Sequence, residues 1–146
     1  MAENYKFLRR IDGSQGVPGV ISLPVAAAQT VLVGQLLIMS SQQLILATAS
    51  VAAPVCVAAE ASAAQAAGTP IRVYPILPGQ IWQAVASASP ATALLGAGLY
   101  DIVNSTAQTV DVADAANGSI LILATRSGVA TDTNIEITFT KGYFWV

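Results

Sequence analysis

The sequence contains no histidine, a single cysteine and few charged residues. Without histidine, the chain lacks the side chain that proteins use most often as a general base and as a metal ligand. Its one thiol, Cys56, lies between Val55 and Val57 in an apolar run, which predicts a buried hydrophobic residue and not a nucleophile. No nucleophile elbow, P-loop or dinucleotide-binding motif is present. We therefore expect no enzymatic activity and no cofactor.

Charge is scarce along most of the chain. Only 10% of the residues are charged and 54% are hydrophobic, whereas about 25% are charged in an average globular domain. Between residues 13 and 100 the only charged side chains are Glu60 and Arg72. A chain with so little charge leaves apolar surface for another chain to cover, so we predict a homo-oligomer. The net charge of −2 argues against a nucleic-acid partner, which needs a clustered basic footprint.

Neither a membrane span nor a secretory signal is predicted. A transmembrane helix needs about 18 or more apolar residues in succession, and the best run, residues 44–59, is interrupted by Thr48, Ser50 and Pro54. The basic N-terminal residues and the apolar stretch after them superficially match a signal peptide, but Asp12, glycines and prolines interrupt that stretch. We expect a soluble protein with no membrane partner.

Residues 69–86 form the segment around which the fold is expected to be organised. Three prolines exclude a helix, and the β-branched and aromatic residues favour strands on either side of a Pro78-Gly79 turn. Because proline cannot donate a hydrogen bond to a sheet, Pro75 predicts an edge, an end or a bulge. The prediction is two short strands and a turn, with Trp82 buried beside the turn.

Apolar runs of strand length recur on both sides of this segment. Before it, they span residues 20–25, 30–33, 36–39, 44–47 and 54–57. After it, strands are predicted at residues 99–103, 109–112, 119–124 and 135–139, with an Asn117-Gly118 hairpin turn leading into the third of them.

Two short segments lie outside the predicted strands. Residues 60–67 are rich in alanine and precede Gly68, which allows either a two-turn helix or a loop. Residues 143–146 are four bulky side chains, which we expect to dock on the domain or on a neighbouring subunit.

Two pairs of acidic residues were considered as a general acid and base: Asp111 with Asp114, and Asp132 with Glu136. Both pairs are interpreted as solvated positions beside strands. Asp111, Asp114 and Asn117 offer oxygen ligands for calcium, but the spacing and the glycine of an EF-hand loop are absent. No metal site is predicted.

The N-terminal residues 1–19 are predicted to form an arm and a glycine-rich hinge, followed by a single β domain at residues 20–146. Large hydrophobic side chains beside charged ones favour an arm that becomes ordered on a partner, because apolar side chains supply contact area and cations pair with carboxylates. A disordered terminus and an arm folded back on its own barrel are the alternatives. The predicted partner-binding residues are Tyr5, Lys6, Phe7, Leu8, Arg9, Arg10 and Ile11.

Three segments carry a resemblance to a known family. Residues 27–37 read Ala-Ala-Gln-Thr-Val-Leu-Val-Gly-Gln-Leu-Leu, residues 54–60 read Pro-Val-Cys-Val-Ala-Ala-Glu, and residues 71–82 read Ile-Arg-Val-Tyr-Pro-Ile-Leu-Pro-Gly-Gln-Ile-Trp. In this order they resemble the small phage capsid decoration, or cement, proteins, over roughly residues 20–85. The resemblance implies an all-β fold with a small β-barrel or β-tulip domain, here with an extended N-terminal arm.

The same resemblance implies a function. Proteins of this family are structural virion proteins that bind the major capsid protein on the outer capsid surface, often as trimers, and stabilise the shell. The alternative is a carbohydrate-binding or adhesive β-module, for which exposed aromatic side chains would form the stacking platform. Its candidates are Tyr74, Trp82, Tyr143 and Trp145, although Trp82 is expected in the core. A small hydrolase is disfavoured because histidine is absent.

Overall fold

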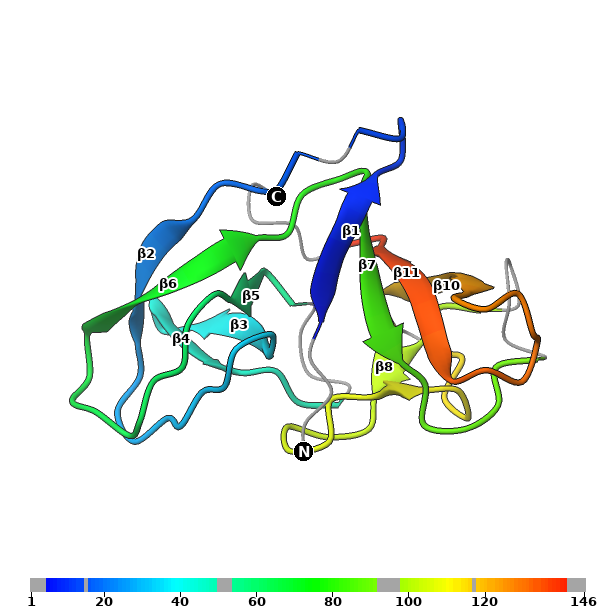
Figure 1. The fold of residues 1–146 in the computed structure, drawn as a ribbon. Coiled ribbons are helices and arrows are strands. Elements are labelled where there is room, and N and C mark those ends of the chain that lie inside the picture. Colours follow the sequence, from blue (N-terminus) through cyan, green and yellow to red (C-terminus); the bar gives the residue numbers. More distant parts are fainter. Residues whose placement is uncertain (1–4, 15, 50–53, 92–97, 117, 142–146) are drawn as a thin grey trace.

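The computed structural model describes residues 5–14, 16–49, 54–91, 98–116 and 118–141. These ranges contain eleven strands and no helix (Figure 1). The strands form a closed five-stranded barrel, a four-stranded sheet and a two-stranded sheet. The prediction of an all-β fold with a small barrel is confirmed.

The barrel is built from the apolar runs in the first half of the chain. Its strands are β2 (Ile21–Val25), β3 (Leu36–Ser40), β4 (Gln43–Leu46), β5 (Cys56–Ala58) and β6 (Thr69–Pro75). They follow the order β2-β4-β3-β5-β6, and the pairing of β2 with β6 closes the barrel. Residues 30–33 form no strand, because only Val31 makes a bridge, to Ser62. Residues 60–67, for which helix and loop remained open, form a loop.

The four-stranded sheet joins the two ends of the described chain. It contains β1 (Lys6–Arg10), β7 (Gln80–Val85), β10 (Ile120–Thr125) and β11 (Asn134–Phe139). Their order is β1-β7-β11-β10, and every neighbouring pair is antiparallel. In β11 the buried side chains alternate with half-buried or exposed ones, as its sequence predicts. The strands β8 (Asp101–Ile102) and β9 (Val110–Asp111) form the small third sheet.

The predicted hairpin between residues 109–112 and 119–124 is wrong. Strand β9 pairs with β8, and β10 pairs with β11. Asn117 lies outside the described residues. Gly118 is required for a different reason, since a Cβ atom at this position would overlap the backbone carbonyl group of Tyr100. The glycine therefore permits a close backbone approach.

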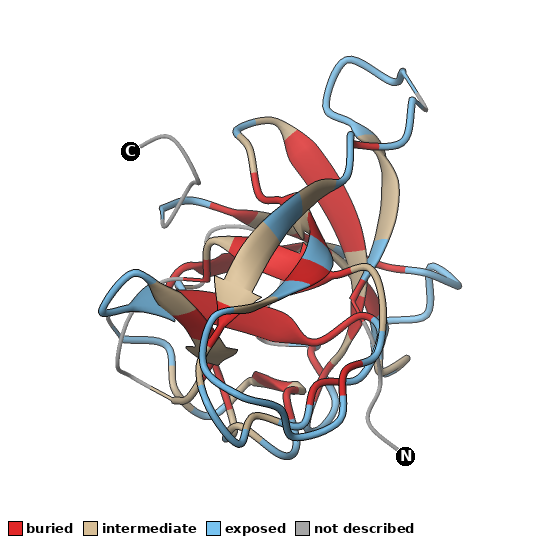
Figure 2. Cartoon of the chain, turned by 90° about the vertical axis from the view of Figure 1, so that its left-hand side faces the viewer, coloured by how far each residue is buried: buried red, intermediate tan, exposed pale blue. Residues whose placement is uncertain are grey.

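Two hydrophobic cores share the barrel strands. In β3, Leu37 faces the barrel interior, whereas Leu36 and Ile38 face a second core formed with the four-stranded sheet. In β5, Cys56 faces the barrel interior and Val57 faces the second core. Both strands are therefore apolar at consecutive positions, and Figure 2 shows the buried residues concentrated between the layers.

Residues 69–86 connect these two cores. Strand β6 ends at Pro75, where it pairs with Cys56 of the barrel, and β7 begins the next sheet at Gln80. Gly79 has a positive φ of 80° in the turn between them. Trp82 is buried, as predicted, with 1% of its surface exposed. The two strands do not pair with each other, because they belong to different sheets.

Candidate functional site

The described residues of the predicted N-terminal arm form a strand of the protein's own sheet. Strand β1 lies along β7 at the front of Figure 1 and pairs with it from Lys6 opposite Gln83 to Arg10 opposite Gln80. This corrects the expectation of an extended arm, because the sheet crosses the predicted boundary at residue 19. The arrangement is closer to the alternative of an arm folded back on its own barrel, although β1 joins the four-stranded sheet and not the barrel. Binding of a partner by this segment stays a prediction.

Tyr5 anchors the start of β1 in the interior. Its side chain is 3% exposed, and its hydroxyl group donates a hydrogen bond of 2.8 Å to the backbone oxygen of Gln108. Its backbone N–H group donates to the oxygen of Gly34, also over 2.8 Å. Burial, and to a smaller extent the negative charge of Asp101, raises the pKa of the Tyr5 hydroxyl group. Tyr5 thus holds β1 against both the barrel and the loop before β9.

Phe7 packs on the central tryptophan. The two rings meet edge to face, with centroids 5.6 Å apart and an angle of 81° between their planes. Leu8 is half-buried. Ile11 is 73% exposed, and its backbone N–H group donates to the oxygen of Gly79. Of the predicted hydrophobic contact residues, Ile11 is therefore the one whose side chain is free for a partner.

Arg9 meets a second arginine at one carboxylate on the outer side of the sheet. Its two terminal nitrogens donate to the two carboxylate oxygens of Glu136, over 3.1 and 2.6 Å. Arg126 donates to the same carboxylate over 2.9 Å. Arg9 is the largest cause of a lowered Glu136 pKa, and Arg126 adds to it against the opposing effect of burial. Sequence reasoning paired Glu136 with Asp132 and missed Arg126, because no local pattern links residues on three different strands.

The remaining two cations of β1 are exposed. Lys6 and Arg10 form no side-chain hydrogen bond or ion pair within the described ranges. Asp12 lies in the turn after β1, where the N–H group of Ser14 is the main cause of its lowered pKa and the charge of Arg10 a smaller one.

The other candidates from the sequence have structural roles. Cys56 is fully buried, and burial raises its pKa to about 12, as expected for an inert thiol. The Asp111 and Asp114 carboxylates accept hydrogen bonds from backbone N–H groups of their own turns. Asp132 does the same for the loop between β10 and β11. Across the described ranges, no three potential metal ligands come together and no helix could cross a membrane.

Aromatic side chains form no exposed platform in the part of the chain that the structure describes. Trp82 is buried and Tyr74 is half-buried, whereas Tyr143 and Trp145 lie outside the described residues. The large hydrophobic side chains exposed there are aliphatic residues and one methionine. A sugar-stacking surface therefore has no support from these ranges.

Comparisons with protein-family models, with curated proteins and with solved structures find no match to this chain.

Proposed function

We propose that this chain is a structural virion protein that binds the major capsid protein on the outer surface of a phage capsid, as a homotrimer, and stabilises the shell. The resemblance in residues 27–37, 54–60 and 71–82 supports this proposal. These segments supply parts of β3, β5, β6 and β7, and β3, β5 and β6 are neighbours in the barrel. No side-chain cluster in the described ranges offers a competing catalytic function.

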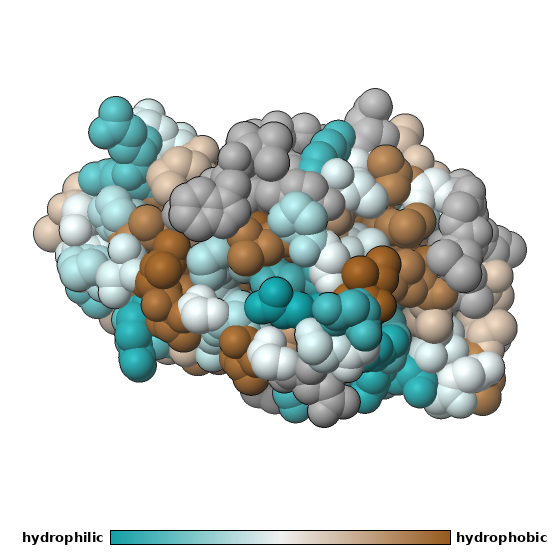
Figure 3. Space-filling model, turned by 90° about the horizontal axis from the view of Figure 1, so that it is seen from above, coloured by the Kyte–Doolittle hydropathy of each residue, from teal (hydrophilic) through white to brown (hydrophobic). Residues whose placement is uncertain are grey.

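The neutral, apolar surface of the barrel carries the proposal. In residues 16–49 and 54–75 the only charged side chains are Glu60 and Arg72, and they neutralise each other in an ion pair of 2.9 Å. Figure 3 shows hydrophobic groups on the barrel side, at the left of the view, and further ones on the opposite side. The exposed hydrophobic residues of these ranges are Val17, Val20, Leu32, Val33 and Met39.

Such a surface suits burial against another protein. Interfaces between subunits are depleted of charge at their centre, and an exposed apolar surface tends to associate in water. Leu32 and Val33 are adjacent and are 45% and 49% exposed. They are the first two residues of a tight turn, closed by the hydrogen bond from the Gln35 N–H group to the Leu32 oxygen, where polar residues would be tolerated. We assign to this surface the contacts between copies of the chain and with the capsid shell.

Cosedimentation with purified capsids, together with analytical ultracentrifugation of the free protein, tests the proposal. The wild-type protein should sediment as a trimer and cosediment with capsids. The double substitution Leu32→Asp and Val33→Asp should abolish one or both associations. Val129→Asp is the control, because Val129 is 59% exposed in the loop between β10 and β11, remote from the barrel in sequence. A wild-type protein that neither associates nor cosediments would refute the proposal.

A further inference from the structure

We propose that the outer face of the four-stranded sheet binds an acidic protein segment through Lys6, Arg9 and Arg126. We call these three residues, with Gln83 and Glu136, the basic sheet face. The inference deepens the proposed function and rests on it for the identity of the partner, an acidic segment of the capsid protein. Its chemistry is testable without capsids.

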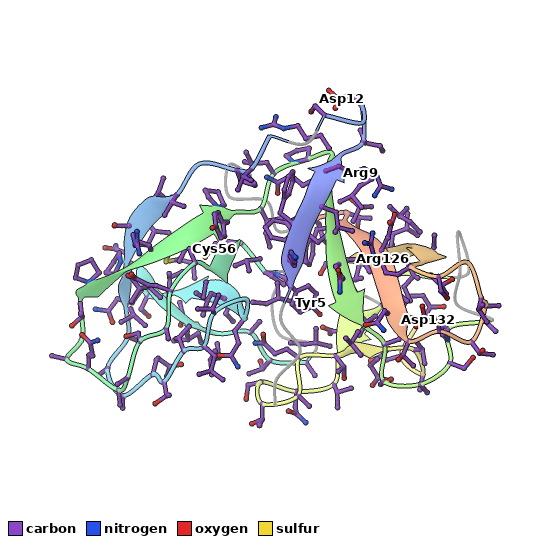
Figure 4. The ribbon with its side chains drawn as sticks, in the orientation of Figure 1. Tyr5, Arg9, Asp12, Cys56, Arg126 and Asp132 are labelled. Atoms are coloured by element: carbon purple, nitrogen blue, oxygen red, sulfur yellow. The ribbon has the colours of Figure 1, made fainter. Side chains whose placement is uncertain are left out.

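The strand register places these side chains on one side of the sheet. Lys6 lies opposite Gln83, and Gln83 lies opposite Glu136. Directly opposed residues of antiparallel strands project to the same side, so Lys6 shares a face with Glu136. Trp82, the neighbour of Gln83, projects to the other side, into the second core. Arg9 and Arg126 reach the Glu136 carboxylate from β1 and from the end of β10. Figure 4 labels Arg9 beside β1 and Arg126 beside β11.

The basic sheet face carries positive charge in a protein with a net charge of −2. Arg9 and Arg126 bind the single carboxylate of Glu136, and Lys6 lies on the same face two strands away. The nearest further acid along the chain, Asp132, directs both carboxylate oxygens to the backbone N–H groups of Ser127 and Asn134. Arg10 lies opposite Gln80, one position beyond Arg9, and therefore projects to the other side of the sheet. Half of the six basic residues of the chain thus gather on this face.

Glu136 holds the guanidinium groups of Arg9 and Arg126 in place before any partner binds. Its side chain is only 13% exposed, whereas those of Arg9 and Arg126 are 36% and 41% exposed. A guanidinium group has five N–H donors, and the bonds to Glu136 use two from Arg9 and one from Arg126. The N–H groups that Glu136 does not bind remain available to a partner, and they belong to guanidinium groups that Glu136 already holds in place. Prior ordering reduces the entropic cost of binding, and the guanidinium fork matches carboxylate geometry.

A carboxylate partner fits this face better than a nucleic acid. A phosphate backbone requires several cations in a row, whereas this face offers three, of which Arg9 and Arg126 are paired with Glu136. A carboxylate group can instead bind one arginine edge, while Lys6 supplies a charge on the same face that forms no ion pair within the described residues. An acidic segment of a protein therefore matches the charge of the face.

Binding of poly-L-glutamate at low ionic strength tests this inference, with Arg126→Gln and Arg72→Gln as matched variants. Each variant removes one partly exposed arginine that forms an ion pair of 2.9 Å with a glutamate, but Arg72 lies on the barrel. We expect Arg126→Gln to weaken binding about tenfold, as for loss of one hydrogen bond to a charged group, and Arg72→Gln to leave it unchanged. Lys6→Gln should also weaken binding, and it breaks no ion pair within the described ranges.

The outcomes separate this inference from the proposed function. Equal effects of the two arginine variants, no binding of poly-L-glutamate, or tighter binding of polyuridylate would overturn the acidic-segment proposal. If wild-type protein binds capsids and Arg126→Gln does so equally well, the inference fails and the proposed function stands. If poly-L-glutamate binding follows the expected pattern but no capsid is bound, the chemistry of the face holds and the proposed function fails.

Discussion

At the residue scale, Trp82 joins the N-terminal strand to the second core. It is 1% exposed and contacts the ring of Phe7. Trp82→Ala should lower the free energy of unfolding by about 3–5 kcal/mol, because it leaves a large cavity. Chemical denaturation followed by circular dichroism measures the loss. The control, Val129→Ala, removes an exposed side chain and should change stability by less than about 0.5 kcal/mol.

A second variant separates the ring of Trp82 from its polar atom. The indole N–H group is buried, and no described residue is its hydrogen-bond partner. Trp82→Phe therefore loses ring volume but no hydrogen bond, and it should cost clearly less than Trp82→Ala. Equal losses in the two variants would mean that the indole N–H group is satisfied, for example by a buried water molecule.

Glu136 makes stability depend on pH. Its pKa lies below the ordinary value of 4.5 because Arg9, and then Arg126, stabilise the carboxylate. The ion pairs therefore contribute to stability above about pH 4.5, and this contribution is lost as the pH falls through the lowered pKa. Glu136→Gln should reduce stability at neutral pH by on the order of 1 kcal/mol and flatten the dependence below pH 4.5.

Melting temperatures measured from neutral to acidic pH check this expectation. Glu60→Gln is the comparison, because Glu60 also has a lowered pKa, caused by Arg72, but its ion pair is more exposed. Glu60→Gln should therefore change the pH dependence of the melting temperature less than Glu136→Gln does. If both variants retain the wild-type profile, another acid controls stability in this range.

At the scale of elements, the β3–β4 hairpin contains a strained turn. Its two central residues, Ser41 and Gln42, have positive φ angles of 48° and 66°. This is the backbone of a type I′ turn, which favours Asn-Gly. Gln42→Gly should raise the free energy of unfolding by about 0.5–1 kcal/mol, since glycine adopts this conformation without a steric penalty.

A glycine in the adjacent strand provides the control for this gain. Gln43 pairs with Ser40 at the start of β4, so Gln43→Gly should destabilise the protein by about 0.5–1 kcal/mol. The denaturant midpoints of both variants show whether each substitution raises or lowers the stability. A loss of stability in Gln42→Gly would show that its side chain makes a contact that matters more than backbone strain.

Strand β1 is expected to be part of the folding unit. Deletion of residues 1–12 removes Tyr5 from its buried site, Phe7 from Trp82 and Arg9 from Glu136. The loss of the packed aromatic rings alone should cost at least about 3 kcal/mol, and the melting temperature should fall sharply. Deletion of residues 1–4, which keeps β1 whole, is the control. An unchanged melting temperature after the longer deletion would restore the prediction of an independent arm.

The sequence predicted the positions of single strands better than it predicted which strands pair with each other. Proline positions and apolar runs identified β2 to β7, because local backbone preferences determine these elements. The partner of β9 was wrong, because the Asn-Gly pair suggested a local hairpin whereas Gly118 serves a contact with Tyr100. The N-terminal segment was predicted to be an arm, whereas β1 pairs with β7, and the meeting of Arg9 and Arg126 at Glu136 depends on that pairing. Such contacts arise only from tertiary structure.

At the scale of the whole molecule, Gln108 connects the barrel to the rest of the protein. It is 2% exposed, and its side-chain oxygen accepts a hydrogen bond of 2.6 Å from the N–H group of Leu36 in β3. Its side-chain nitrogen donates to the backbone oxygens of Leu36 and Ala47. Its own backbone oxygen accepts the hydroxyl group of Tyr5. One residue thus links β3, the end of β4 and the start of β1.

The hydrogen bonds of Gln108 and the barrel strands that face both cores join the barrel to the four-stranded sheet. The protein should therefore unfold in one cooperative transition. Gln108→Met keeps the length of the side chain but leaves the Leu36 N–H group buried without its acceptor, so stability should fall by about 1–3 kcal/mol. Gln42→Met, at an exposed position in the β3–β4 turn whose side chain forms no hydrogen bond within the described residues, is the control and should be nearly neutral. Circular dichroism and tryptophan fluorescence should give coincident transitions for the wild-type protein. Transitions that separate only in Gln108→Met would identify this side chain as the source of cooperativity, whereas separate transitions in the wild type would show that the two cores unfold independently.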